Sequence, residues 1–182
     1  NLCKKNGSII YVGRLSEEKG VDLLIKAWKD WGADAPKLEI IGDGAQKDDL
    51  IKLAQSSYNI EFKGNLDKEL VNEYLKSAAI LVAPSRWYET FGLTVIEAMQ
   101  HSVALVVSDV AHFPDFANVS NGVVFKSDDY LDLLKAVKEL YSDKPALEKA
   151  QQSARKAYLE GFSEEINYSH IMRIYAKKIG RE

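Results

Sequence analysis

The stretch AILVAPSRWYETFGLTVIEAMQ, residues 79–100, joins a strand to a helix through a polar loop. Residues 79–83 form a continuous apolar run, and Pro84 ends it because proline has no N–H to donate to a neighbouring strand. From Leu93 onward apolar residues recur at helical spacing, which predicts a helix over 93–100. A buried strand followed by a helix is the repeating unit of parallel α/β sheets.

The same alternation extends along the chain in both directions from this stretch. Further strands are predicted at 8–13, 37–42, 59–63, 104–108 and 122–126. Between them lie helical patterns, such as Val21, Leu24 and Trp28 on one face, and a helix with Leu70 inward that Asp67 is expected to cap. We therefore predict an α/β fold, a Rossmann-like doubly wound parallel sheet of about six strands with helices on both faces.

After residue 126 the pattern is helical only. One helix is expected to run to about Tyr141 with Leu131 and Val137 inward, a second over 145–160, and a third from a cap at Ser163. We expect one domain over 1–182, in which 1–7 are a linker remnant and 127–182 are C-terminal helices.

The composition excludes several classes of protein. Hydrophobic residues make up 46% and charged residues 28%, which fits a globular domain rather than a disordered chain. The net charge is −3 and the basic residues are spread along the chain, so a nucleic-acid-binding surface is not expected. The single cysteine cannot form an internal disulfide, and the three scattered histidines show no metal-ligand spacing. The single cysteine fits a cytoplasmic compartment, and neither a signal peptide nor an apolar run of about 20 residues is present.

Three loops are expected where strands end, the edge at which such sheets bind ligands. Arg14 and Lys19 flank the loop 13–20, which either holds an anion or is a solvated loop with two surface cations. The turn 42–44 and the loop 62–66 either approach a ligand or are tight connections.

The loop 84–92 carries the strongest chemical signal. The backbone N–H groups of Gly92, Leu93 and Thr94 are expected at a helix N-terminus, where the macrodipole favours phosphate. Glu89 precedes this terminus and Glu97 lies along the helix, so both carboxylates are able to accept hydrogen bonds from hydroxyls of one extended ligand. The alternative is a solvated Glu97 and a Glu89 that only stabilises the helix dipole.

Taken in order, these motifs resemble family 4 retaining glycosyltransferases of the GT-B fold. The resemblance covers about residues 8 to 126 and rests on Gly13-Arg14 with Lys19-Gly20, Gly42-Asp43-Gly44, Pro84-Ser85, Glu89-Thr90-Phe91-Gly92-Leu93 and Glu97-Ala98-Met99. It implies the C-terminal, donor-binding domain of a two-domain enzyme whose N-terminal acceptor domain is absent from this chain. Its partners would be a nucleotide-sugar donor and that missing domain, and no nucleic acid. The resemblance is also compatible with peripheral membrane association through the missing domain.

The resemblance also implies a role for each matching residue. Arg14 and Lys19 would bind the donor diphosphate and stabilise the leaving group without a metal or any other cofactor. Glu89 would bind the transferred sugar and Glu97 the ribose hydroxyls. The remaining donor-binding residues would be Gly13, Gly42, Gly64, Asn65 and Leu66 near the nucleoside, and Phe91, Gly92, Leu93 and Thr94 at the phosphate.

The sequence departs from the family pattern at three places. Thr90 replaces a common glycine, residues 102–104 replace Gly-x-Pro, and residues 111–115 replace Gly-Gly-x-Pro-Glu. The last change leaves the geometry of the sugar subsite open, and it motivates an alternative, a non-catalytic nucleotide-sugar-binding module.

A third class, an NAD-type oxidoreductase, lacks its Gly-x-Gly-x-x-Gly signature after the first strand. Sugar-nucleotide epimerases share the architecture, but the sequence matches their motifs less well. The expected function is the donor-binding half of a retaining glycosyltransferase, which transfers a sugar to a glycan, lipid or other acceptor and is inactive alone. Neither the base, the sugar nor the acceptor follows from the sequence.

Overall fold

The computed structural model describes residues 5–57, 59–87, 92–117 and 121–179, and it contains a six-stranded parallel sheet. The strands are β1 (Ile9–Val12), β2 (Leu38–Ile41), β3 (Ile60–Gly64), β4 (Ile80–Ala83), β5 (Ala104–Ser108) and β6 (Gly122–Phe125). They lie in the order β3-β2-β1-β4-β5-β6, and every neighbouring pair is parallel. The predicted doubly wound sheet is confirmed.

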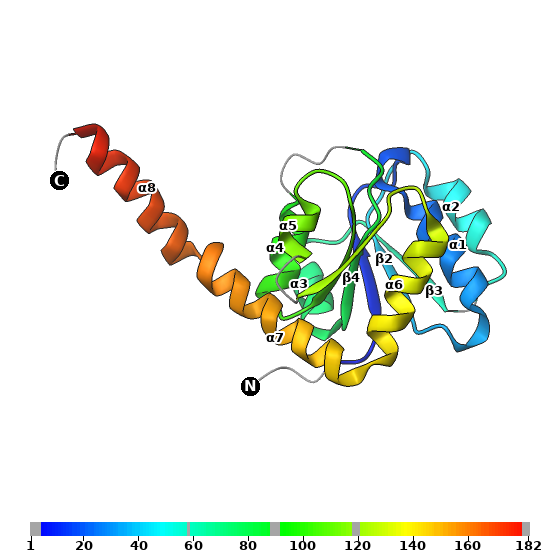
Figure 1. Ribbon diagram of the computed structural model, residues 1–182. Coiled ribbons are helices and arrows are strands. Elements are labelled where there is room, and N and C mark those ends of the chain that lie inside the picture. The colour runs from blue at the N-terminus through cyan, green and yellow to red at the C-terminus, as the bar shows by residue number, and fades with distance from the viewer. Residues whose placement is uncertain (1–4, 58, 88–91, 118–120, 180–182) are drawn as a thin grey trace.

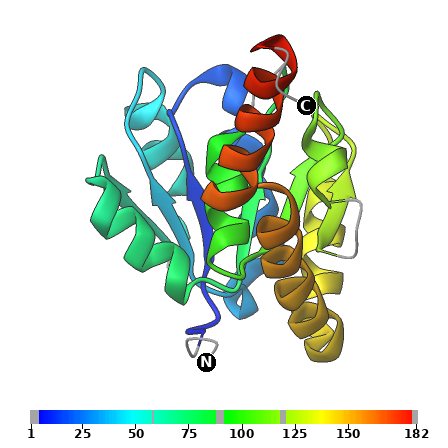
Figure 2. The ribbon, with the colours of Figure 1, turned by 90° about the vertical axis from the view of Figure 1, so that its left-hand side faces the viewer.

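Helices cover both faces of this sheet, as Figures 1 and 2 show. They are α1 (Val21–Trp31), α2 (Lys47–Ala54), α3 (Lys68–Ser77), α4 (Leu93–Gln100), α5 (Phe113–Ala117), α6 (Tyr130–Ser142), α7 (Lys144–Gly161) and α8 (Glu164–Ile179), with 3-10 turns η1 (Glu17–Lys19) and η2 (Gly32–Asp34). One buried cluster joins α1, α2 and α6 to the sheet, and a second joins α3, α4 and α5 to the other face. The central strands β1, β4 and β5 read as continuous apolar runs because both of their faces are buried.

Two side chains predicted to point inward are exposed instead. Leu70 is 43% exposed and Leu131 is 58% exposed. Both lie in the first turn of their helices, and the buried stripe of α6 begins only at Leu133 and continues through Val137. The predicted cap of α3 is confirmed, because the Asp67 carboxylate accepts a hydrogen bond from the Leu70 N–H at 2.9 Å.

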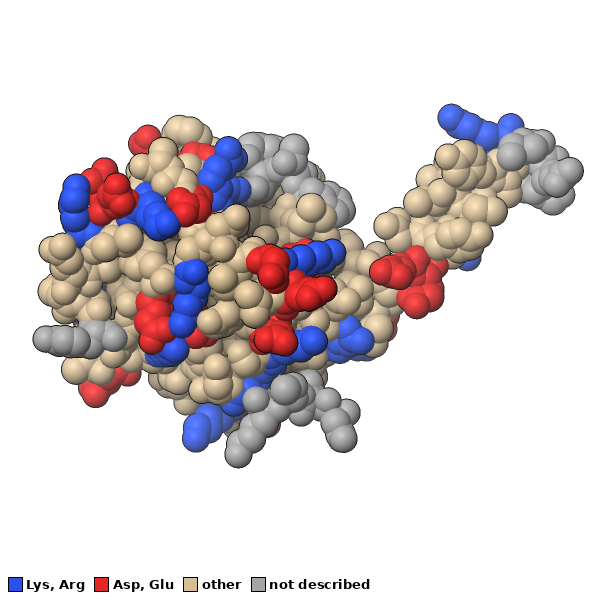
Figure 3. Space-filling view, turned by 180° about the vertical axis from the view of Figure 1, so that it is seen from behind, with Lys and Arg blue, Asp and Glu red and all other residues tan. Residues whose placement is uncertain are grey.

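The last helix, α8, projects away from the rest of the chain (Figure 1). It exposes a row of large apolar side chains, Tyr168, Ile171, Met172, Ile174 and Tyr175. Among the described residues, no helix combines the length and the apolar composition that crossing a membrane requires. On the face in Figure 3, basic and acidic side chains are interspersed over the described surface rather than gathered by sign.

The strand order fixes where the chain reverses direction across the sheet. β1 and β4 are neighbours in the middle of the sheet, and successive strands move outward from them in opposite directions. The carboxyl edge beside β1 and β4 is therefore the topological switch point, where open α/β sheets bind ligands. This edge lies at the top of Figure 1.

Candidate functional site

The loops after β1 and β2 are bound to each other at the carboxyl edge. The Gly13 N–H donates to the Ile41 carbonyl at 3.0 Å, and the Leu15 N–H donates to the Asp43 carbonyl at 2.9 Å. A Cβ atom at Gly42, where φ is +141°, would lie 1.8 Å from the Gly13 carbonyl oxygen. Glycine is therefore required at position 42, because the two backbones approach too closely for any side chain.

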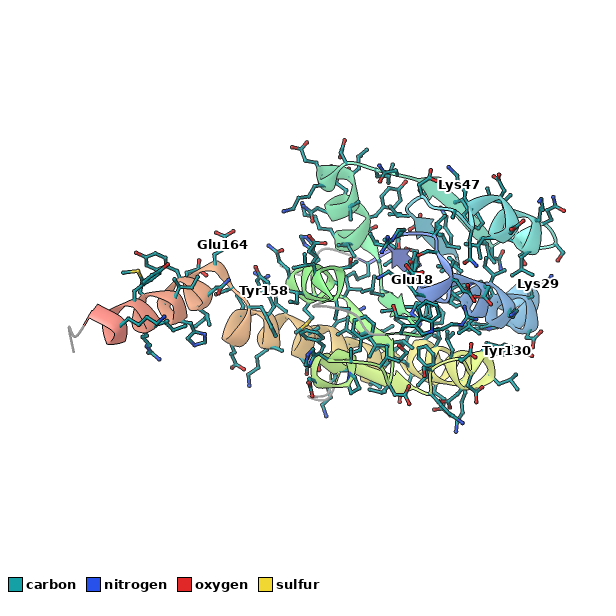
Figure 4. The ribbon with its side chains drawn as sticks, turned by 90° about the horizontal axis from the view of Figure 1, so that it is seen from above. Glu18, Lys29, Lys47, Tyr130, Tyr158 and Glu164 are labelled. Atoms are coloured by element: carbon teal, nitrogen blue, oxygen red, sulfur yellow. The ribbon has the colours of Figure 1, made fainter. Side chains whose placement is uncertain are left out.

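A cavity of about 550 Å³ opens beside these two loops. Of the residues predicted to bind a donor, it brings together Gly13, Arg14, Gly42, Asn65, Leu66 and Glu97. They come from the ends of β1 and β2, the loop after β3, and α4. Figure 4 looks down on this edge, where Glu18 of η1 lies near the middle, between Lys47 and Tyr130.

A second, smaller pocket of about 90 Å³ adjoins the cavity. It is lined by Lys19 together with Gly92, Leu93 and Thr94, the residues that begin α4. The two hollows share Val12 and Gly13 at the end of β1, so they lie on either side of the same strand end. The structure thus brings the predicted cation of the first loop to the predicted helix N-terminus.

The N-terminus of α4 is built without a side-chain cap from its own cap residue. Gly92 is the N-cap with φ of 69°, and the helix begins at Leu93, as predicted. Because glycine has no side chain to accept from the first-turn amides, these N–H groups and the helix dipole are suited to an anion.

Arg14 and Lys19 lie in different surroundings. The Arg14 side chain is 69% exposed at the rim of the larger cavity and lies 3.5 Å from a carboxylate oxygen of Glu18. A hydrogen bond from the Ser16 hydroxyl, at 2.6 Å, and nearby Arg14 and Lys19 lower the pKa of Glu18. Glu18 therefore lies near both cations; Arg14 lies at the rim of the larger cavity, and Lys19 lines the smaller pocket.

Of the remaining predicted site residues, the structure describes Gly64 but not Glu89 or Phe91. Gly64 supports the turn after β2, because its carbonyl accepts a hydrogen bond from the Gly42 N–H at 2.8 Å. Glu89 and Phe91 lie outside the described residues, so their predicted roles stay predictions.

Two positions that depart from the family pattern keep a glycine-like backbone. Ser102 has φ of 56° and Ala111 has φ of 52°. Both stand where the resemblance expects glycine, and both adopt the left-handed conformation that glycine favours. The backbone at both positions is therefore in a conformation that a glycine would adopt without strain.

Sequence reasoning missed the contribution of α3 to the larger cavity. Lys68 and Asn72 line it, and their spacing of four residues places them on one helix face. That spacing was a usable signal, since the first turn of α3 follows the carboxyl end of β3. The Asn72 amide oxygen lies 3.2 Å from Nε2 of His101, whose pKa is lowered by burial and by nearby Lys76.

The arrangement is suited to an extended ligand with an anionic part. The larger cavity offers apolar walls and the Glu97 carboxylate, an acceptor for hydroxyl groups, and the smaller pocket offers an ammonium group and a helix N-terminus. Among the described residues, no three His, Cys, Asp or Glu side chains are grouped so as to hold a metal ion.

A family model described as Glycosyl transferases group 1 matches residues 2–157. The chain belongs to the group 1 glycosyl transferases. Glycogen synthase from Mycobacterium tuberculosis is 32% identical over 160 residues, 85% of this chain and 38% of that protein. The chain spans less than half the length of the curated relatives it matches.

Solved structures of glycosyl transferases share the fold of this group 1 member. Sucrose-phosphate synthase from Thermosynechococcus elongatus superposes with a TM-score of 0.84 at 22% identity, covering 96% of this chain and 46% of that one. HepE from Anabaena, in complex with UDP and glucose, superposes with a TM-score of 0.80 at 17% identity, covering 94% and 49%. The Rossmann-like fold expected for a GT-B domain is thereby confirmed.

Proposed function

We propose that this chain is the donor-binding half of a retaining glycosyltransferase that uses a nucleoside-diphosphate sugar. One observation carries the proposal: Lys19 and the first turn of α4 line one small pocket, which adjoins the cavity that Glu97 lines. A nucleoside diphosphate has the matching order of groups, with base and ribose at one end and two phosphates at the other. HepE, of the same fold, in complex with UDP and glucose supports this class of ligand.

In this proposal the nucleoside occupies the larger cavity. The base lies near Gly42, Asn65 and Leu66, and the ribose hydroxyls donate hydrogen bonds to the Glu97 carboxylate. The diphosphate crosses the end of β1 beside Gly13 and reaches Lys19 and the amides of Leu93 and Thr94. Arg14 approaches it from the rim.

The chemistry proposed for this site is electrostatic. When the bond between the anomeric carbon and the diphosphate oxygen breaks, the leaving group gains negative charge. Lys19, Arg14 and the dipole of α4 stabilise that charge, in place of a metal ion. The acceptor hydroxyl attacks from the face that the diphosphate leaves and passes its proton to the departing diphosphate oxygen, which retains the anomeric configuration, while Glu89 binds hydroxyls of the transferred sugar.

An acceptor-binding domain completes the proposed enzyme, and without it the chain binds a donor and transfers nothing. The length of the relatives supports this, since the chain matches 38% of the glycogen synthase. The exposed apolar row of α8 supports it too, because such a surface is suited to contact with another domain. We propose a cytoplasmic enzyme whose contact with a membrane, if it has one, is made through the acceptor domain.

Calorimetry of this chain with UDP, GDP and ADP tests the proposal. We expect one of them to bind in buffer without a divalent metal, with an affinity that falls as salt rises, because charged contacts are screened. Replacing Lys19 by alanine should weaken that binding about tenfold or more, the effect of one charge-assisted contact.

Lys29→Ala is the matched control for this measurement. Lys29 lies at the far end of α1, where its ammonium donates to the Leu53 carbonyl at 3.2 Å, and it is well separated from Glu18 in Figure 4. Its loss should leave affinity unchanged. Absence of binding for all three nucleotides, or equal losses in the two variants, would contradict the proposal.

The second candidate function is a non-catalytic nucleotide-sugar-binding module. Ala111 and His112, in place of two glycines, are the observation that favours it. Against it, Ala111 keeps the left-handed backbone that glycine would adopt. Transferase activity of the full-length protein, abolished by Lys19→Ala or Glu89→Gln, would exclude this alternative.

A further inference from the structure

We propose that Arg86 is a positioning residue that holds Lys19 against the N-terminus of α4. The proposal rests on the proposed function, because it concerns the grip on the diphosphate. Arg86 lies in the loop after β4, and its side chain is only 16% exposed.

The guanidinium of Arg86 forms a two-pronged contact with Asp22 in the first turn of α1. Nη1 donates to one carboxylate oxygen at 2.6 Å, and Nη2 donates to the other at 2.9 Å. Such paired hydrogen bonds between guanidinium and carboxylate fix both distance and orientation. The contact therefore ties the loop after β4 to the helix that follows the Lys19 loop.

Two further contacts of Arg86 reach the turn that carries Lys19 itself. Nη1 also donates to the Glu17 carbonyl at 3.1 Å, and the Arg86 backbone N–H donates to the Glu18 carbonyl at 2.8 Å. Glu17 and Glu18 are the two residues before Lys19 in η1. Arg86 thus binds the backbone of this turn on both residues that precede the lysine.

Two further contacts fix the loop after β4 in place against its neighbours. Nε of Arg86 donates to the Asp128 carboxylate at 2.7 Å, which adds the loop before α6 to the assembly. Gly20, directly after Lys19, has φ of +64°, and a Cβ atom there would lie 2.1 Å from the Pro84 carbonyl oxygen. The Lys19 turn and the loop after β4 are therefore packed backbone to backbone, with Arg86 as the side chain that spans them.

The contacts of Arg86 lie near the proposed phosphate end of the ligand and away from its nucleoside end. The contacts of Arg86 go to η1, α1 and the loop before α6, whereas the larger cavity is lined by the ends of β1 and β2 and by α3 and α4. Loosening Arg86 should move Lys19 away from the phosphate position and leave the nucleoside end intact. A purely structural role would weaken both ends together.

The first test compares Arg86→Lys with Lys26→Met. Lysine keeps the positive charge but has no planar fork, so it cannot satisfy Asp22 and the Glu17 carbonyl together. Lys26 is the other partner of Asp22, at 2.9 Å on the next turn of α1, and it makes a matched control. The quantities to measure are the affinities of the wild type and both variants for the nucleoside diphosphate that the wild-type chain binds and for the corresponding nucleoside.

The expected result is a split between these two ligands. Arg86→Lys should weaken diphosphate binding about tenfold and leave nucleoside binding within about twofold, while Lys26→Met changes neither. Equal losses for diphosphate and nucleoside would overturn the proposal. A wild-type chain that binds no nucleotide would instead refute the proposed function, so the two failures are distinguishable.

A double-mutant cycle provides the second test. If Arg86 acts through Lys19, then Arg86→Lys should weaken diphosphate binding by less than about twofold in a Lys19→Ala background, because the effects of the two changes are coupled. The same loss in both backgrounds would overturn the proposal. Should Arg86→Lys fail to fold, Asp22→Asn loosens the same contact from the other side, and the same cycle with Lys19→Ala decides.

Discussion

At the scale of single residues, Asp22 shows how one carboxylate joins two segments. Its carboxylate forms ion pairs with Arg86 of the loop after β4 and with Lys26 of its own helix. Burial alone would raise the pKa of Asp22, but the hydrogen bonds from Arg86 and Lys26 lower it to about 2. The same contact with Asp22 raises the pKa of the Arg86 guanidinium. Both groups of the pair are therefore charged at neutral pH.

Acid should remove the contribution of Asp22 to stability. The folded-state pKa of Asp22 is depressed from 3.8 to about 2, so its stabilising effect is present above pH 4 and is lost as the pH falls toward 2. The loss should be about 1 to 2 kcal/mol, after allowance for partial exposure. Urea unfolding at several pH values measures it.

Asp22→Asn is the comparison that isolates this effect from other carboxylates. The variant should have a lower free energy of unfolding than the wild type at pH 5, and the difference should shrink as the pH falls to 2. A difference that stays constant over this range would show that the Asp22 charge does not stabilise the fold.

Residue types alone did not reveal Arg86. Its partners Asp22 and Asp128 lie 64 and 42 positions away in the sequence, and no local pattern links them. Similarly, the sequence shows that Ser102 and Ala111 replace glycines, but only the coordinates show that both retain a positive φ. Contacts between distant loops follow from the strand order, which is a property of the whole sheet.

At the scale of elements, the packing of the loops after β1 and β2 depends on Gly42. Replacing it by alanine should destabilise the chain by about 1 to 3 kcal/mol, because the new methyl group would overlap the Gly13 carbonyl. Nucleotide binding should weaken as well, since both loops line the larger cavity. Chemical denaturation and calorimetry check the two effects.

Gly161→Ala is the matched control for Gly42→Ala. Gly161 is the last residue of α7, and a Cβ atom there would meet nothing within 4 Å. This substitution should be neutral or stabilise by up to about 1 kcal/mol, because alanine is the better helix former. If the two variants had the same stability, the close approach at Gly42 would not matter to the fold.

Most elements could be predicted because each is marked by its own residues. β1, β4, β5 and β6 are apolar or nearly apolar runs, β2 and β3 are short runs that include charged residues, and the start of α4 follows from Gly92 and the periodicity after it. α5 was missed, since it has only five residues and contains Pro114. The inward faces of α3 and α6 were predicted one turn too early, because periodicity does not show where a helix first meets the sheet.

At the scale of the whole molecule, the site depends on the order in which the strands are arranged. β1 and β4 are separated by more than 60 residues in sequence, yet they pair through Ile9 and Ile80. Their pairing brings the Lys19 loop and the start of α4 to one edge. The sequence predicted that these regions meet only through the resemblance to a family, since local patterns do not encode strand order.

The projection of α8 has a consequence for how the chain melts. A helix of 16 residues that gains little from tertiary packing is marginal in water by itself. On mild heating, part of the helical circular dichroism signal should therefore be lost before the sheet unfolds. The chain should melt in two transitions rather than one. A truncation after Ser163, which keeps the packing of Phe162 on Phe116, should abolish the earlier transition and leave the later midpoint within about 2 °C. A single transition in the 182-residue chain would mean that α8 unfolds together with the sheet.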